Sequence, residues 1–170
     1  LTKWLFGALT RPAISSTLIP IMSYRSSHPS MPSSPKTVGS VADPALLDHP
    51  FSTIESDIIE FRLDSLLNQL PIVKNVLLKL KKSQIQTLIT ARCATEGGES
   101  QLNTTQRSQL IMGLSPMANF VDIELANLAE MREAASYAQD MGCLLIASHH
   151  NFKKTPPSDQ LQDIISRAVD

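Results

Sequence analysis

The feature that most constrains the fold of this chain is a regular alternation of strand-like and helix-like segments that begins near residue 35. The strand-like runs are short and apolar, and each is followed by a stretch with the apolar spacing of a helix. We expect strands at residues 36–41, 57–64, 85–91, 120–125 and 143–148. We expect helices at residues 66–82, 104–114 and 126–141, and a further one from Ser158 onward. Strict alternation of this kind predicts right-handed βαβ units that build a parallel sheet.

Residue types at the helix ends refine these expectations. A brief helix should open at Asp43-Pro44, because proline suits the first turn of a helix. Thr104 or Thr105 is the candidate cap of the helix at 104–114. Gly142 is expected to end the helix at 126–141, since glycine readily adopts the left-handed backbone that follows a helix.

Five parallel strands can close in two ways, as a flavodoxin-like open sheet or as the first part of a (β/α)8 barrel. Strand side chains alternate between two faces. A sheet with helices on both faces should be apolar on both, whereas the upper interior of a barrel can be polar and functional. Here every strand after the first carries polar side chains on one face near its C-terminal end. They are Glu60, Arg62 and Asp64; Thr90 and Arg92; Asp122 and Glu124; Ser148 and His150.

We therefore predict an α/β fold, a (β/α)8 TIM barrel truncated in this chain to about the first five βα units. A structural ion pair explains Glu60 with Arg62 equally well when that pair is taken alone. Four strands that share the pattern indicate a site.

The last expected strand runs from Leu144 directly into Ser148-His149-His150-Asn151. A buried strand that ends in polar residues delivers them to the edge where parallel α/β proteins place their chemistry. By alternation, His150 shares the inward face with Ser148, and His149 turns toward the helix layer, where it should matter mainly for packing. The simpler interpretation is a pair of half-buried polar residues at a strand end.

Composition excludes several classes of protein. The chain has 170 residues, of which 42% are hydrophobic and 18% charged, and its net charge is −1. These values are typical of one globular domain and favour neither nucleic acid nor a membrane as partner. Two cysteines are too few for a disulfide framework and favour a reducing, cytoplasmic environment.

Residues 1–34 differ from the rest of the chain. No acidic residue occurs before Asp43, and prolines interrupt any long helix. We expect a disordered or non-domain leader at 1–34 and one partial barrel domain at 35–170. The leader is either upstream sequence translated in error, with Met31 as the true start, or an organelle targeting peptide.

Several motifs resemble those of one known family. The segment 121–125, Val-Asp-Ile-Glu-Leu, is followed after residues 126–147 by Ser-His-His-Asn-Phe at 148–152. Together they resemble the signature of type I 3-dehydroquinate dehydratase. Further similar segments occur in the family's order at 35–40, 60–64, 92–99 and 154–156. The resemblance extends over residues 35–170, and its combined motifs are specific.

This resemblance implies a (β/α)8 barrel lyase of the shikimate pathway, which serves chorismate and aromatic amino acid biosynthesis. Such an enzyme dehydrates 3-dehydroquinate to 3-dehydroshikimate through a lysine Schiff base. His150 matches the histidine that acts as general base and then general acid, and Glu96 matches the carboxylate that supports it. The resemblance implies no metal and no organic cofactor. The positions that match substrate-binding residues are Ser40, Glu60, Arg62 and Arg92.

The chain departs from the family pattern at one decisive position. The Schiff-base lysine of the family lies on the sixth strand, past the position that corresponds to Asp170, and is absent from this chain. Lys153 and Lys154 lie just after His150 and do not match it. We therefore expect an incomplete sequence of a longer enzyme, which alone is inactive. A smaller difference is Phe61, where the family usually has tryptophan.

Two other functions compete with this interpretation. A metal-dependent barrel hydrolase could use His149, His150, Asp122 and Glu124 as ligands, although adjacent histidines on a strand point to opposite faces. A non-catalytic binding module derived from the barrel is the other. The sequence is compatible with a homodimer.

Overall fold

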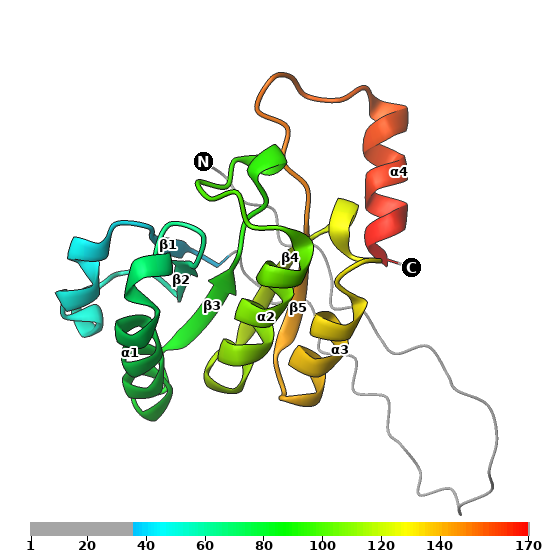
Figure 1. The fold of residues 1–170 in the computed structure, drawn as a ribbon. Helices are drawn as coiled ribbons and strands as arrows, with labels where there is room; N and C mark the ends of the chain where they lie inside the picture. The colour runs from blue at the N-terminus through cyan, green and yellow to red at the C-terminus, as the bar shows by residue number, and fades with distance from the viewer. Residues whose placement is uncertain (1–35, 170) are drawn as a thin grey trace, which may run out of the picture.

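The sheet of this protein has five parallel strands in the order β1-β2-β3-β4-β5 (Figure 1). The computed structural model describes residues 36–169, so the predicted leader at 1–34 lies outside the described residues. All five predicted strands are confirmed. Each strand begins no more than two residues from its expected start. Their bounds are β1 Val38–Val41, β2 Ile58–Arg62, β3 Gln86–Thr90, β4 Phe120–Glu124 and β5 Leu144–Ser148.

The strand order decides between the two closures that the sequence left open. A flavodoxin-like sheet has the order 2-1-3-4-5, in which β1 lies between β2 and β3. Here each strand instead pairs with its neighbour in sequence, as the strands of a (β/α)8 barrel do. The barrel prediction is therefore confirmed for the part of the chain that the structure describes.

Three helices cover one face of the sheet (Figure 1): α1 Leu70–Lys82, α2 Thr104–Leu114 and α3 Arg132–Asp140. The fourth, α4 Ser158–Val169, lies near the C-terminal ends of the strands and packs against the short 3-10 helix Leu125–Asn127. A 3-10 helix at Pro44–Asp48 confirms the brief helix expected there, with the Asp43 side chain as its cap. No helix between residues 36 and 169 is long and apolar enough to span a membrane.

Two expectations about helix ends were wrong. The cap of α2 is Asn103, not Thr104 or Thr105: its Oδ1 accepts from the backbone N of Gln106, and the Gln106 side chain accepts from the backbone N of Asn103. The third helix begins at Arg132, not at residue 126. The intervening residues form the 3-10 helix Leu125–Asn127 followed by turns.

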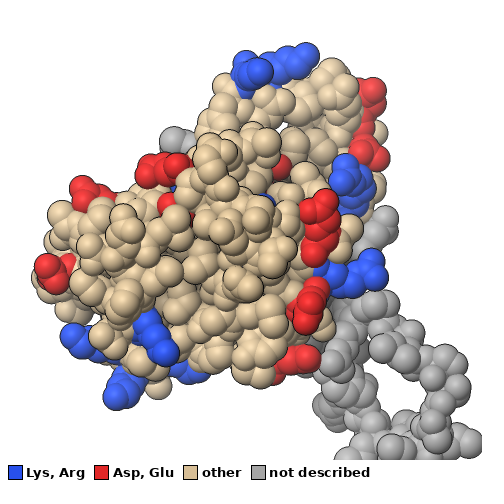
Figure 2. All heavy atoms as spheres, in the orientation of Figure 1, with Lys and Arg blue, Asp and Glu red and all other residues tan. Residues whose placement is uncertain are grey.

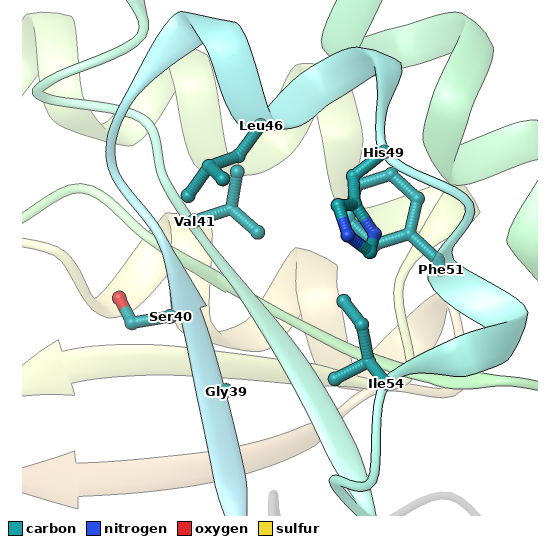
Figure 3. A pocket seen from close by; sticks show the side chains of 7 residues that line it. All are labelled: Gly39, Ser40, Val41, Leu46, His49, Phe51 and Ile54. Atoms are coloured by element: carbon teal, nitrogen blue, oxygen red, sulfur yellow. The ribbon is translucent and has the colours of Figure 1, made fainter.

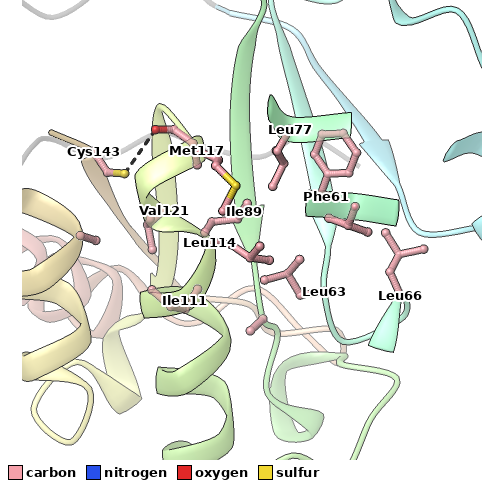
Figure 4. Close-up of a cluster of buried hydrophobic side chains, with 14 of the residues drawn as sticks. Phe61, Leu63, Leu66, Leu77, Ile89, Ile111, Leu114, Met117, Val121 and Cys143 are labelled. Carbon is pink, nitrogen blue, oxygen red and sulfur yellow. Dashed lines mark hydrogen bonds between the residues drawn. The ribbon is translucent and has the colours of Figure 1, made fainter. Parts of the chain in front are cut away.

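The main hydrophobic core lies between the sheet and the helices (Figure 4). Phe61, Ile89 and Val121 point from three neighbouring strands toward α1 and α2, and none of them is exposed. They meet Leu77 of α1 and Ile111 of α2. Burial of each such side chain stabilises the fold by about 1.5–3 kcal/mol.

The opposite face of the sheet has two layers. A small apolar cluster of Ile58, Leu88 and Ile146 forms the layer near the N-terminal ends of the strands. Glu60, one alternation further along β2, pairs in register with Ser40 of β1. Polar side chains therefore follow the apolar layer toward the C-terminal ends, which confirms the pattern predicted from strand alternation.

Charges on the outer surface are mixed. On the face shown in Figure 2, basic side chains gather over the C-terminal end of α1 and near the loop before α4, with acidic side chains between them. The basic residues in the last turn of α1 are Lys79, Lys81 and Lys82, where cations are favoured by the helix dipole.

Candidate active site

The candidate site is built from the C-terminal ends of β2 to β5 and the loop that follows β3. Because the strands are parallel and adjacent, these ends meet at one edge of the sheet. An apolar pocket beside β1 is lined by Ser40, Val41, Phe51 and Ile54 among others (Figure 3). It borders the polar site, because Ser40 also lies beside Glu60 in the register of β1 and β2.

Arg92 is the centre of the network and is only 2% exposed. Its Nη1 lies 3.0 Å from Asp122 Oδ1, 3.0 Å from Glu124 Oε1 and 2.7 Å from Ser148 Oγ. The Ser148 hydroxyl in turn donates to Asp122 Oδ1 at 2.7 Å. Burial alone would lower the pKa of the Arg92 guanidinium, but Asp122 and Glu124 raise that pKa above its usual value.

The second terminal nitrogen of Arg92 is different. Nη2 is buried and has no hydrogen-bond partner among the residues that the structure describes. A buried donor without a partner is costly in a native protein and needs an explanation. Because a guanidinium is permanently charged, this nitrogen is a strong donor held inside the site.

Arg62 at the end of β2 is held by Asp64 in a two-pronged pair. Arg62 Nε donates to Asp64 Oδ1 at 3.0 Å, and Nη2 donates to Oδ2 at 2.7 Å. Asp64 also accepts from the backbone N of Arg92 and of Glu99, each at 3.1 Å. Burial would raise the pKa of Asp64, but the hydrogen bonds from Arg62 and from the backbone lower it below its usual value. For Arg62, burial would lower the pKa, yet Asp64 raises it.

Glu60 lies on the inner face between these arginines and β1. It is 3% exposed, and its Oε1 accepts from the Thr90 hydroxyl at 2.7 Å. Ser40 is exposed and is its neighbour in register on β1. A carboxylate and a hydroxyl thus line the face that also carries Arg62.

His150 and Glu96 form a pair. His150 Nδ1 lies 3.0 Å from Glu96 Oε2, and the backbone N of His150 donates to the same oxygen at 2.8 Å. Because Nδ1 is engaged by the carboxylate, Nε2 is the nitrogen that can exchange a proton with a ligand. The Phe152 ring stacks on the imidazole, with 6.3 Å between ring centroids and an interplanar angle of 13°.

Two glycines allow the loop after β3 to place Glu96 beside His150. Gly97 has a φ of +86°, a left-handed conformation that side chains rarely adopt, and an added Cβ would lie 2.7 Å from the Phe152 ring. An added Cβ at Gly98 would lie 2.2 Å from the carbonyl oxygen of Arg92. The loop can therefore fold back onto the strand end only because neither position has a side chain.

The structure brings together the residues that the sequence singled out. Glu96 and His150 are in contact, and Glu60, Arg62 and Arg92 lie at neighbouring strand ends. Their individual roles remain predictions. One expectation was wrong: His149 is exposed and does not pack under the helix layer. The residue of β5 that packs against α4 is Ala147, which meets Ala168.

Sequence reasoning missed Arg107 and did not foresee that Asp64 is a buried anchor of the network. Asp64 was recognised only as part of a polar face, and its four hydrogen bonds were not foreseen. Arg107 comes from α2, and its Nη2 donates to Glu124 Oε2. A signal for Arg107 existed, since the spacing to Ile111 and Leu114 places it on the buried stripe of the helix.

The alternative metal site receives no support from the arrangement of its proposed ligands. Asp122 and Glu124 are bound to Arg92, and His150 is bound to Glu96. Within residues 36–169, no group of three or more His, Cys, Asp or Glu side chains is placed to hold a metal ion.

Comparison with known proteins decides the family. Residues 37–170 match the family model described as Type I 3-dehydroquinase. The chain belongs to this family. The motifs at 121–125 and 148–152 therefore identified the family correctly, and they contain Glu124, Ser148 and His150 of the network described above.

Curated relatives carry the name 3-dehydroquinate dehydratase. The protein of Hydrogenobaculum sp. is 31% identical over 115 residues, which are 67% of this chain and 52% of the relative. The Aquifex aeolicus protein is 32% identical, over 65% of this chain and 49% of the relative. A Methanococcus maripaludis protein is 34% identical, over 66% of this chain and 50% of the relative. The chain thus spans about half the length of the curated relatives it matches.

Solved structures of the same family share the fold. The type I 3-dehydroquinate dehydratase of Clostridium difficile, crystallised with covalently modified comenic acid, superimposes with a TM-score of 0.67 at 26% identity. The match covers 76% of this chain and 56% of that one. The Enterococcus faecalis 3-dehydroquinate dehydratase also gives a TM-score of 0.67 at 26% identity, over 79% of this chain and 63% of that one.

Proposed function

We propose that the natural protein containing this chain dehydrates 3-dehydroquinate to 3-dehydroshikimate in the shikimate pathway. The reaction would pass through a Schiff base on a lysine outside residues 1–170. The observation that carries this proposal is the pairing of His150 with Glu96 at the strand ends. It is accompanied by a buried nitrogen of Arg92 that has no hydrogen-bond partner among the described residues. Family membership and the names of the curated relatives support it.

The charged residues suit a substrate that is a polyhydroxylated acid. Arg62 and Arg92 supply donors with fixed geometry for a carboxylate or for hydroxyl oxygens. Glu60 and Ser40 supply acceptors, and the Ser40 hydroxyl can also donate. Since the pKa values of both arginines are raised, both remain charged at any physiological pH.

In the proposed mechanism His150 has two roles. Its Nε2 removes the proton from the carbon next to the imine carbon, and the electron pair moves into the protonated imine. The imidazolium then protonates the departing hydroxyl group, which leaves as water. Glu96 holds the imidazole through Nδ1, so that Nε2 keeps its direction in both steps.

Several further predictions accompany this function. We propose a barrel domain that begins near residue 35, a cytoplasmic location, and a small-molecule substrate rather than nucleic acid or a membrane as partner. No metal and no organic cofactor is required by the proposed chemistry. Sedimentation of the purified natural protein would distinguish a monomer from a homodimer.

The test uses the natural polypeptide that contains these 170 residues. Conversion of 3-dehydroquinate is followed by the ultraviolet absorbance of the conjugated enone product. Borohydride added during turnover should reduce the imine and trap the substrate on a lysine, which mass spectrometry would locate. Failure to form 3-dehydroshikimate, or turnover that chelators abolish and borohydride does not affect, would refute the proposal.

A further inference from the structure

We infer that Arg107 is a positioning residue that keeps one guanidinium nitrogen of Arg92 free for the ligand. This inference rests on the proposed function, because the ligand concerned is the acidic, hydroxylated substrate. Arg107 lies on α2, outside the sheet, and is 2% exposed. It therefore cannot touch a ligand at the strand ends and must act through the residues that it contacts.

Arg107 is fixed at two points. Its Nε donates to the carbonyl oxygen of Ala91 at 2.7 Å, and its Nη2 donates to Glu124 Oε2. Ala91 directly precedes Arg92 in the chain. One side chain thus holds both the backbone that leads into Arg92 and the carboxylate that contacts the Arg92 guanidinium.

Glu124 has its two oxygens committed to different partners. Oε1 accepts from Arg92 Nη1 and from the backbone N of Cys93, each at 3.0 Å. Oε2 accepts from Arg107 and from Asn127 Nδ2 at 3.3 Å. Arg92 therefore meets a single oxygen of Glu124, through a single nitrogen.

This division matters because a carboxylate and a guanidinium favour a two-pronged pair. If Oε2 of Glu124 lost Arg107, only the longer hydrogen bond from Asn127 Nδ2 would hold it, and it could turn toward Arg92 and accept from Nη2. The nitrogen that now has no partner among the described residues would then be occupied. Arg107 prevents this competition by binding Oε2 itself.

The charges lead to the same conclusion. Asp122 and Glu124 both lie 3.0 Å from Nη1 of Arg92, so two carboxylates share one cation. Arg107 brings a second buried positive charge to Glu124. With Arg107 in place, two guanidinium groups face these two carboxylates, so Arg92 does not have to balance both of them alone.

The experiment compares Arg107→Gln, Arg107→Met and Arg107→Lys in the natural polypeptide, with Arg132→Gln on the exposed start of α3 as the matched control. For each protein the Kd for 3-dehydroquinate, kcat, KM and the midpoint of thermal unfolding are measured. We expect Arg107→Gln and Arg107→Met to raise KM and Kd by about 10- to 100-fold. This is the change in affinity that corresponds to the loss of one hydrogen bond to a charged group. The value of kcat should change by less than about 3-fold.

Arg107→Lys should give intermediate values, since an ammonium can neutralise Glu124 but cannot form the fork that also reaches Ala91. It keeps the test valid if the other variants fail to fold. Arg132→Gln should match the wild type in every measurement.

A double-mutant cycle separates positioning from general stability. If Arg107 acts through Arg92, Arg107→Gln combined with Arg92→Gln should bind no more weakly than Arg92→Gln alone. Additive losses, or an unchanged Kd in folded Arg107 variants, would overturn the inference. A wild-type protein that binds 3-dehydroquinate without turnover would refute the proposed function. The Kd values of the Arg107 variants would still test the positioning role of Arg107. A wild-type protein that does not bind it would refute both.

Discussion

Replacing Asp64 by asparagine removes one charge without changing the size of the side chain. Among substitutions of this kind, it should disrupt the site most. Asp64 accepts four hydrogen bonds: two from the Arg62 side chain and one each from the backbone N of Arg92 and Glu99. It therefore ties the end of β2 to the end of β3 and to the loop that carries Glu96. It is 3% exposed, so water cannot replace the lost partners.

The magnitude follows from what asparagine retains. It keeps one acceptor oxygen, but its amide NH2 would face donors on the side that now meets Arg62 Nη2 and Glu99 N at 2.7 Å and 3.1 Å. Hydrogen bonds to charged groups contribute about 1.5–3 kcal/mol each, and breaking a buried ion pair costs about 3–5 kcal/mol. Because the contacts are not additive, we expect a loss of about 3–5 kcal/mol in the free energy of unfolding. We also expect kcat/KM to fall by about 10²-fold, since Arg62 and Glu96 would both be misplaced.

The assay is urea unfolding of the natural protein at several pH values, with exposed Asp48→Asn as the matched control, which should change stability by no more than about 0.5 kcal/mol. Because the pKa of Asp64 is lowered on folding, its contribution is fully present above the usual aspartate value of about 3.9. That contribution is lost as the pH falls through the lowered pKa. The difference between wild type and Asp64→Asn should therefore shrink below about pH 4. Equal unfolding midpoints at pH 7, or a difference that persists unchanged into acid, would refute the reasoning.

Three further predictions concern the histidines, the glycine loop and the leader. His150→Ala should lower kcat by about 10²–10⁴-fold, whereas exposed His149→Ala should leave kcat nearly unchanged; equal losses in folded variants would contradict the assignment of faces. Gly98→Ala should destabilise the protein by about 1–3 kcal/mol and lower kcat/KM, because its Cβ would meet the Arg92 carbonyl. Gly113→Ala, within α2, should be neutral or stabilising in the same unfolding assay, because its added Cβ would meet no other described part of the chain within 4 Å. Deletion of residues 1–34 should leave thermal stability and kcat/KM unchanged, and a large loss of either would show that the domain begins earlier.

Much of the fold was predictable because strand alternation and helical spacing are local signals. The strands, the limits of α2 and the separation of an apolar from a polar face all followed from periods of two and 3.6 residues. The start of α3 did not, because residues 126–131 have apolar spacing compatible with an α-helix, whereas the chain forms a 3-10 helix and turns there. The cap of α2 was ambiguous, since Asn103, Thr104 and Thr105 are all residues that can cap, and only the side-chain direction distinguishes them.

The site was predictable to the extent that its residues lie on strands. Alternation placed Glu60, Arg62 and Arg92 on one face, and the family resemblance added Glu96 and His150. The partners that hold these side chains depend on contacts between residues far apart in sequence. Arg107, for example, reaches a carboxylate 17 positions away. No local period carries that information, which is why its role emerged only from the structure.

The candidate ligand-facing groups share one construction, which explains why so many charges are buried. Arg62 is held by Asp64, Arg92 by Asp122 and Glu124, and His150 by Glu96. Buried ion pairs contribute little net stability, because the desolvation of two charges offsets their attraction. Under the proposed function their benefit is orientation: each partner fixes one edge of a donor or base and leaves the other edge for the ligand. Loss of a holding carboxylate should therefore reduce activity even though no atom that contacts the substrate has changed.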